Sequence, residues 1–159
     1  MSAYAHSGPL AGLPDPELDR RFYAGLPGRR LLAWLIDVAI ILLAGVPLAL
    51  VFGLLTLGFG FALFGFIIAA TGFLYRTALL AGPASATLGM RFTGIEFRRG
   101  NGERFDAATA FLHTVIYMIC IGFLPLQLVS CLTIAGTRYR QSIADIILGT
   151  TAINRPADS

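Results

Sequence analysis

The chain has 159 residues, of which 56% are hydrophobic and only 13% charged, and its mean hydropathy is +0.74. Soluble domains carry about 25% charged residues, so this composition excludes an ordinary soluble protein and indicates an integral membrane protein. The net charge of +3 reflects arginines at the ends of apolar stretches, a pattern typical of membrane topology signals and not of a nucleic-acid surface. We therefore expect the lipid bilayer, and no nucleic acid, as a partner.

Residues 1–28 contain four prolines and little apolar sequence, so they predict a flexible cytoplasmic tail. The apolar stretch 31–52 is long enough, at about 1.5 Å per residue, to cross a hydrocarbon core about 30 Å thick. It holds one charge, Asp37. A carboxylate in a span costs at least ~2.5 kcal/mol, so it needs a partner. Arg30 lies seven residues earlier on the same helix face, and its stem can run along the helix toward Asp37.

A second apolar stretch, 58–80, is rich in Phe and Gly and predicts a second span. The turn between the two spans holds no arginine. Basic residues flank the pair instead: Arg20, Arg21, Arg29 and Arg30 come before it, and we assign Arg76, Arg91, Arg98, Arg99 and Arg104 to the segment after it. By the positive-inside rule, the N-terminus and the segment 76–106 are expected on the cytoplasmic side.

The segment between the second and third apolar stretches has a strand-like pattern. Residues 92–98 alternate between apolar and polar side chains, which predicts a half-buried strand, and the turn at 100–102 contains two glycines. Asp106 is a plausible N-cap for the helix that follows. We expect this segment to form a small cytoplasmic cap resembling a β-hairpin, with residues 148–153 as a second strand that pairs with 92–98.

The third apolar stretch, 107–135, leaves two topologies open, because it is interrupted near 122–125 by a Gly and a Pro. One kinked span would place the C-terminus outside. Two short helices that meet at the break would return it to the cytoplasm, and we favour this version because it lets the two strands pair. The predicted fold is thus an all-α membrane bundle of three or four helices over residues 29–154, with 155–159 as a short tail.

Three motifs in this order resemble the RDD family of small bacterial membrane proteins, which is named for an arginine and two aspartates. They are Arg30-x-x-Ala33-x-x-x-Asp37, Thr87-Leu88-Gly89-Met90-Arg91-x-x-Gly94-Ile95, and Arg140-Gln141-x-x-x-Asp145-x-x-x-Gly149-Thr150. The resemblance implies a multi-pass protein of the bacterial inner membrane. It also implies a transport role in general terms, which for some members is cation/proton exchange. Family members often carry an arginine where this chain has His113.

Three interpretations of the polar residues follow. In the first, which we favour, Arg30, Asp37, Arg91 and Asp145 form a buried cluster with His113 that locks the helices together, because breaking a buried pair costs about 3–5 kcal/mol. In the second, Asp37 and His113 are a proton or cation site of a transporter, which would need a homo-oligomer to build a pathway.

The third interpretation is an accessory subunit of a larger membrane complex, or a protein that binds lipid headgroups through Arg98 and Arg99. An enzyme is not expected, because the sequence lacks zinc-helix and nucleophile-elbow motifs and has only two histidines. No cofactor and no metal site is predicted. Cys120 and Cys131 lie in apolar sequence and are predicted to be packing residues.

Overall fold

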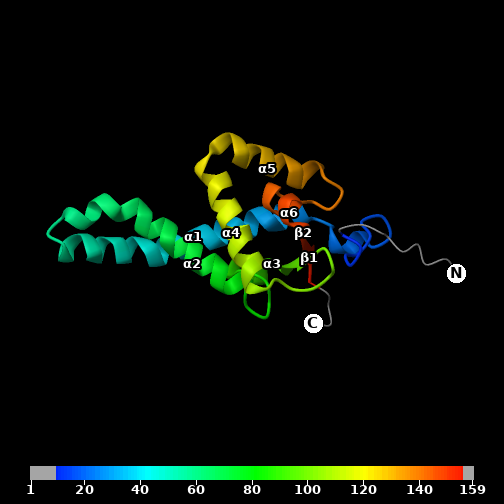
Figure 1. The fold of residues 1–159 in the computed structure, drawn as a ribbon, viewed down its shortest axis with the longest axis horizontal. Coiled ribbons are helices and arrows are strands. Elements are labelled where there is room, and N and C mark those ends of the chain that lie inside the picture. The colour runs from blue at the N-terminus through cyan, green and yellow to red at the C-terminus, as the bar shows by residue number, and fades with distance from the viewer. Residues whose placement is uncertain (1–9, 156–159) are drawn as a thin grey trace.

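Two long helices and a group of shorter elements make up residues 10–155, the part of the chain that the computed structural model describes. The elements follow in the order η1 (Arg20–Phe22), α1 (Leu26–Leu55), η2 (Phe59–Leu63), α2 (Phe64–Leu80), α3 (Leu88–Thr93), β1 (Ile95–Arg99), α4 (Ala107–Gly122), α5 (Leu124–Gly136), α6 (Ile143–Leu148) and β2 (Thr150–Asn154). The chain is therefore mostly helical with one small sheet, as predicted. Figure 1 shows α1 and α2 projecting together as a hairpin, with the other elements gathered around its base.

Small residues hold the α1–α2 hairpin together. Gly45, Ala49 and Gly53 of α1 are buried at intervals of four residues, so they share one face of the helix. At Gly45 the backbone of Ile68 in α2 lies 3.5 Å from where a Cβ would be, and at Gly53 a Cβ would overlap the Phe61 ring. The small residues on this face thus let the chain that follows α1 pack closely against it.

By length and composition, two helical runs are able to cross a membrane: the run that ends at Leu55 and the run Phe59–Leu80. The third apolar stretch contains the expected break. α4 ends at Gly122, Phe123 is extended, and α5 starts with Pro125 in its first turn, so the two helices are bent by 118°. If this bent pair counts as one broken span, the described chain has up to three.

The sheet differs from the predicted hairpin-like cap. Its strands are distant in sequence: β1 pairs antiparallel with β2, and Ile95 lies opposite Asn154. The predicted pairing partners are right, but the first strand starts at Ile95, because Thr87 caps a short helix, α3, that includes Phe92. We call α3, α6 and this sheet the cap. Asp106 caps α4 as predicted and accepts from the Thr109 amide at 2.7 Å.

The N-terminal segment also differs from the predicted flexible tail. From Leu10 onward it is described, and it packs onto the cap. The Gly12 amide donates to the Gly100 carbonyl at 2.8 Å, and Asn154 Nδ2 donates to the Arg21 carbonyl at 2.7 Å. Leu13 and Tyr23 are buried. Residues 1–9 and 156–159 lie outside the described residues.

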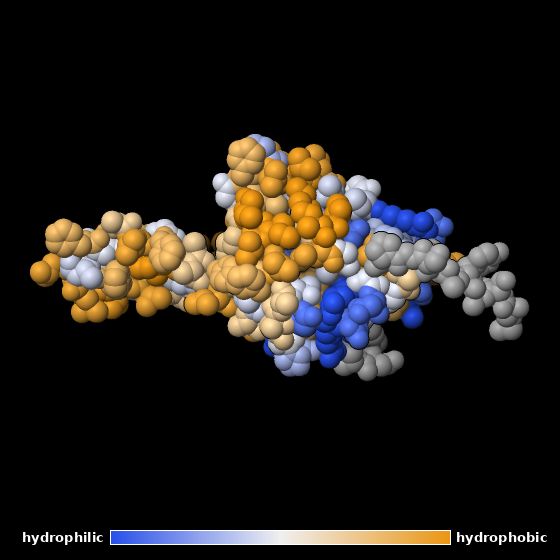
Figure 2. Space-filling model, viewed as in Figure 1, coloured by the Kyte–Doolittle hydropathy of each residue, from blue (hydrophilic) through white to orange (hydrophobic). Residues whose placement is uncertain are grey.

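The surface divides into two regions (Figure 2). In this view apolar residues cover the α1–α2 hairpin and the α4–α5 pair, and hydrophilic residues gather at the end where the cap lies. Exposed side chains such as Leu55, Phe59 and Leu132 explain the apolar part. A surface of this kind is stable in lipid and not in water, so the fold is that of a membrane protein with a polar cap at one end.

Candidate functional site

Asp145 is a buried carboxylate that pairs with an arginine from another helix. Its side chain is fully buried. Oδ2 accepts from Arg30 Nη2 of α1 at 2.7 Å, and Oδ1 lies 2.9 Å from His113 Nε2 of α4. Because an ionised carboxylate only accepts hydrogen bonds, Nε2 carries the proton in this contact. One carboxylate thus ties α6 to two helices that lie 32 and 115 residues away in sequence.

Local sequence explains why Asp145 stands where it does. Ser142 is the N-cap of α6, and the two residues form a capping box in which the Ser142 amide donates to Asp145 Oδ2 at 2.9 Å. Thr150 Oγ1 also donates to Oδ1, at 3.2 Å. Burial alone would raise the pKa of Asp145, but the Arg30 guanidinium and the bonds from His113 and Ser142 outweigh burial and hold that pKa below its ordinary value.

Asp37 forms a second centre, in which no cation of residues 10–155 pairs with the carboxylate. It is buried in α1, and all its recorded partners are neutral. Oδ1 accepts from Tyr75 Oη at 2.7 Å and from the Gly89 amide at 2.9 Å, and Oδ2 accepts from Thr87 Oγ1 at 2.6 Å. These donors come from α2 and from the start of α3. Asp37 therefore fastens the cap to the helical hairpin.

Gly89 makes the Asp37 contact possible. A Cβ at this position would lie 2.8 Å from Asp37 Oδ1 and closer still to the Ala33 carbonyl oxygen. Only a residue without a side chain lets the α3 backbone reach the carboxylate. The Thr-Leu-Gly sequence at 87–89 thus supplies one hydroxyl donor and one amide donor to the same group.

The predicted single cluster around Asp37 is wrong in its connections. Arg30 pairs with Asp145 and not with Asp37. Arg91 is exposed and donates only to the Ala86 carbonyl, at 3.2 Å, among the bonds of the described residues. His113 joins the Asp145 centre. The signal that could have separated the two centres is the N-cap pattern Ser142-x-x-Asp145, which places this aspartate at the start of a helix.

Arg98 and Arg99, the proposed lipid or partner contacts, are bonded within the cap. Arg98 pairs with the buried Glu96, and Arg99 Nη1 lies 3.1 Å from Asp106 Oδ2. Arg155 also approaches Glu96, with 3.6 Å between Nε and Oε2. These guanidinium groups therefore support the sheet and the start of α4.

Arg76 lies in a different place from the one that the sequence analysis predicted. We assigned it to the segment after the second span, but it lies within α2 and is 7% exposed. Its guanidinium carbon stands 3.9 Å from the centre of the Tyr117 ring. Within residues 10–155 it forms no hydrogen bond and no ion pair, and its Nε is buried without a partner. Its position four residues before the end of the apolar stretch was the available signal.

Among residues 10–155, no group of three or more His, Cys, Asp and Glu side chains is arranged to hold an ion. Cys120 is buried, whereas Cys131 is exposed on α5, and both are free thiols.

A comparison with known protein families agrees with the order of the three motifs in the sequence. The sequence model of the RDD family matches residues 23–149. This chain belongs to the RDD family. No curated protein and no solved structure is detectably similar to it. The RDD match covers α1 through α6, so it includes Arg30, Asp37 and Asp145 as they are placed here.

Proposed function

We propose that this RDD protein is a non-enzymatic, multi-pass protein of a bacterial plasma membrane in which the two aspartates fasten a cytoplasmic cap to a helical hairpin. Arg98 and Arg99 lie in the cap, whereas the turn between α1 and α2 holds no arginine, which supports a cytoplasmic location for the cap and for the N-terminus. In this proposal the protein offers the cap as a fixed surface at the membrane, and its polar centres are structural.

One observation carries this proposal: in both aspartates, both carboxylate oxygens contact donors from distant parts of the chain. Asp37 joins α1 to α2 and α3, and Asp145 joins α6 to α1 and α4. A site for a transported proton or cation needs a carboxylate oxygen that is free to exchange partners. Here each oxygen is within 2.9 Å of at least one protein donor.

Solute transport by a homo-oligomer is the second candidate, and one observation favours it. Arg30, Asp37, Arg76 and His113 all line one cavity of about 430 Å³ among the helices. A cavity of that size holds a small solute. A chain with so few spanning helices would need further copies of itself to surround a pathway.

Isosteric substitution separates the two candidates. Asp37→Asn and Asp145→Asn, purified in detergent and reconstituted in vesicles, are compared with the wild type for unfolding midpoint and for proton flux driven by a pH gradient. The structural proposal expects lower unfolding midpoints for both variants and the same background flux as the wild type. A wild-type flux that Asp37→Asn abolishes while its unfolding midpoint is unchanged would overturn the structural proposal in favour of transport.

A further inference from the structure

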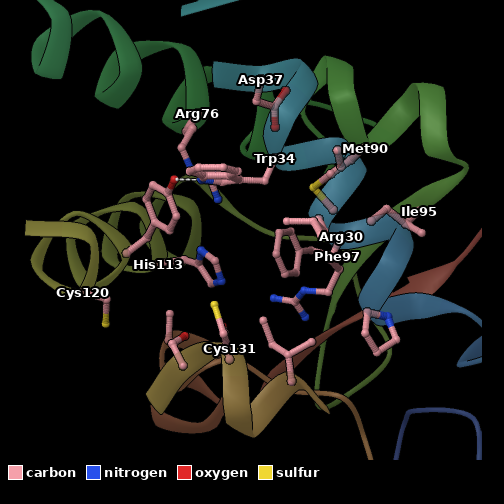
Figure 3. A pocket seen from close by; sticks show the side chains of 18 of the residues that line it. Arg30, Trp34, Asp37, Arg76, Met90, Ile95, Phe97, His113, Cys120 and Cys131 are labelled. Carbon is pink, nitrogen blue, oxygen red and sulfur yellow. Dashed lines mark hydrogen bonds between the residues drawn. The ribbon is translucent and has the colours of Figure 1, made fainter. Parts of the chain in front are cut away.

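A cavity lies where the bent pair α4–α5 faces α1. It has a volume of about 430 Å³ and is lined by these three helices, by Arg76 of α2 and by residues of the cap. Figure 3 shows side chains from different helices, among them Arg30, His113 and Cys131, around one common space. Most of its lining is apolar, as in sites that bind small organic molecules.

Arg76 places an unpaired cation at this cavity. The guanidinium is buried, lines the space, and makes no hydrogen bond or ion pair among residues 10–155. The Tyr117 face offers a cation–π contact, which compensates only part of the cost of removing a charge from water. An arginine in this state lacks an anion, and its planar group is suited to a carboxylate or a phosphate.

Arg76 is the group at the cavity that can bind such an anion, because the other charged groups there already have partners in the protein. Arg30 is already engaged by Asp145, and the carboxylates of Asp37 and Asp145 are held by donors of the protein. His113 uses Nε2 on Asp145, while its Nδ1 is buried without a partner. A ligand at this end of the cavity can therefore gain contacts that the protein itself does not satisfy.

The rest of the cavity is suited to a hydrocarbon chain. Ile134, Met90 and Ile95 are among its lining residues. Two further lining residues, Leu31 and Cys131, are exposed, so the cavity reaches the surface between α1 and α5. The outer faces of both helices are apolar, and this opening therefore faces acyl chains when the protein is in a bilayer.

We propose that this cavity binds an anionic amphiphile, a molecule with a carboxylate or phosphate head on a single hydrocarbon chain, and that Arg76 pairs with the head. The chain of the ligand lies among the apolar residues and leaves through the opening beside Cys131. This binding site goes beyond the structural role of the two aspartates, because their oxygens are already bonded within the protein.

Trp34, the single tryptophan of the chain, provides a direct test. It lines the cavity, and its Nε1 donates to Tyr117 Oη at 2.9 Å, beside the ring that contacts Arg76. The full chain in dodecyl maltoside is titrated with 9,10-dibromostearate, whose bromines quench tryptophan at short range. We expect saturable quenching by the acid, and at least tenfold weaker binding of its methyl ester, which has the same chain without the charge.

Two variants test separately where the head group and the hydrocarbon chain of the ligand bind. Arg76→Gln should weaken dibromostearate binding at least tenfold, whereas Arg91→Gln, which alters an exposed arginine, should leave it unchanged. Unfolding of ligand-free Arg76→Gln should occur at a temperature no lower than in the wild type, because the variant loses only the contact with the Tyr117 ring and no longer buries a charge. Cys131→Phe should block the opening and weaken binding without altering a charge, and it decides the matter if Arg76→Gln fails to fold.

Competition identifies the head group. Stearate and lysophosphatidic acid should both displace the brominated probe, and their order of potency tells a carboxylate site from a phosphate site. Acetate and inorganic phosphate, which have no chain, should not displace it. Equal binding of acid and ester, unchanged affinity in a folded Arg76→Gln, unchanged affinity in Cys131→Phe, or displacement by inorganic phosphate alone would each overturn the proposal. None of these outcomes depends on whether the aspartates are structural.

Discussion

Asp37 and Asp145 are both buried carboxylates of one membrane protein, and the chain stabilises them in different ways. Asp145 lies against the Arg30 guanidinium and the His113 ring, so a cation holds it, whereas among the described residues Asp37 accepts only from two hydroxyls and one backbone amide. The difference follows from position. Asp145 starts a short helix of the cap, within reach of Arg30 near the start of α1, while Asp37 lies a further seven residues into that helix. Oriented neutral donors can therefore replace a countercharge inside the hairpin.

The largest effect is expected from removing the charge of Asp145. Asp145→Asn leaves the mostly buried Arg30 guanidinium without its anion, and such a broken pair costs about 3–5 kcal/mol in free energy of unfolding. Equilibrium unfolding in mixed micelles measures this change. In the double variant Arg30→Gln/Asp145→Asn the loss should be smaller than the sum of the two single losses. Additive losses would show that the two side chains do not interact.

A smaller loss is expected at the Asp37 centre when its backbone approach is blocked. Gly89→Ala places a Cβ against the Ala33 carbonyl and the Asp37 carboxylate. As a result α3 must move, and the hydrogen bond from the amide of residue 89 to Asp37 lengthens. Overpacking of this kind costs typically about 1–3 kcal/mol. Gly65→Ala is the matched control, because a Cβ at Gly65 meets nothing within 4 Å. Equal unfolding free energies for the two variants would contradict the close approach of α3 to α1.

These two centres also mark what the sequence was able to predict. The helical membrane fold and the pairing of two distant strands followed from apolar length and alternation, which are local patterns. The partner of Arg30 did not follow, because Asp37 is near in sequence and Asp145 is 115 residues away. The burial of Arg76 was missed for a related reason. Its position near the end of the second apolar stretch does not reveal that the Tyr117 ring, which comes from a different helix, packs against it.

Acid should weaken the Asp145 centre in a defined pH range. The folded pKa of Asp145 lies below its ordinary value of about 3.9, so its contribution to stability is complete above that value and is lost as the pH falls through the folded pKa. We expect the contribution of Asp145 to the wild-type unfolding free energy to decline only below about pH 4, and the decline in that range to be smaller in Asp145→Asn. A titration of the unfolding midpoint from pH 7 to pH 3 in both proteins measures this difference. Equal acid sensitivity would mean that other carboxylates control the decline.

The smallest effect is expected at Arg91, which the sequence pattern grouped with the aspartates. Its side chain is exposed, and its one recorded bond is to the Ala86 carbonyl. Arg91→Gln should therefore change the unfolding free energy by no more than about 0.5 kcal/mol, as for most surface substitutions. Arg30→Gln, measured beside it, removes the same charge from a pair with Asp145 and should cost several times more. If Arg91→Gln were as damaging as Arg30→Gln, the arginine at 91 would have to reach one of the two carboxylates, and the division into two separate centres would be wrong.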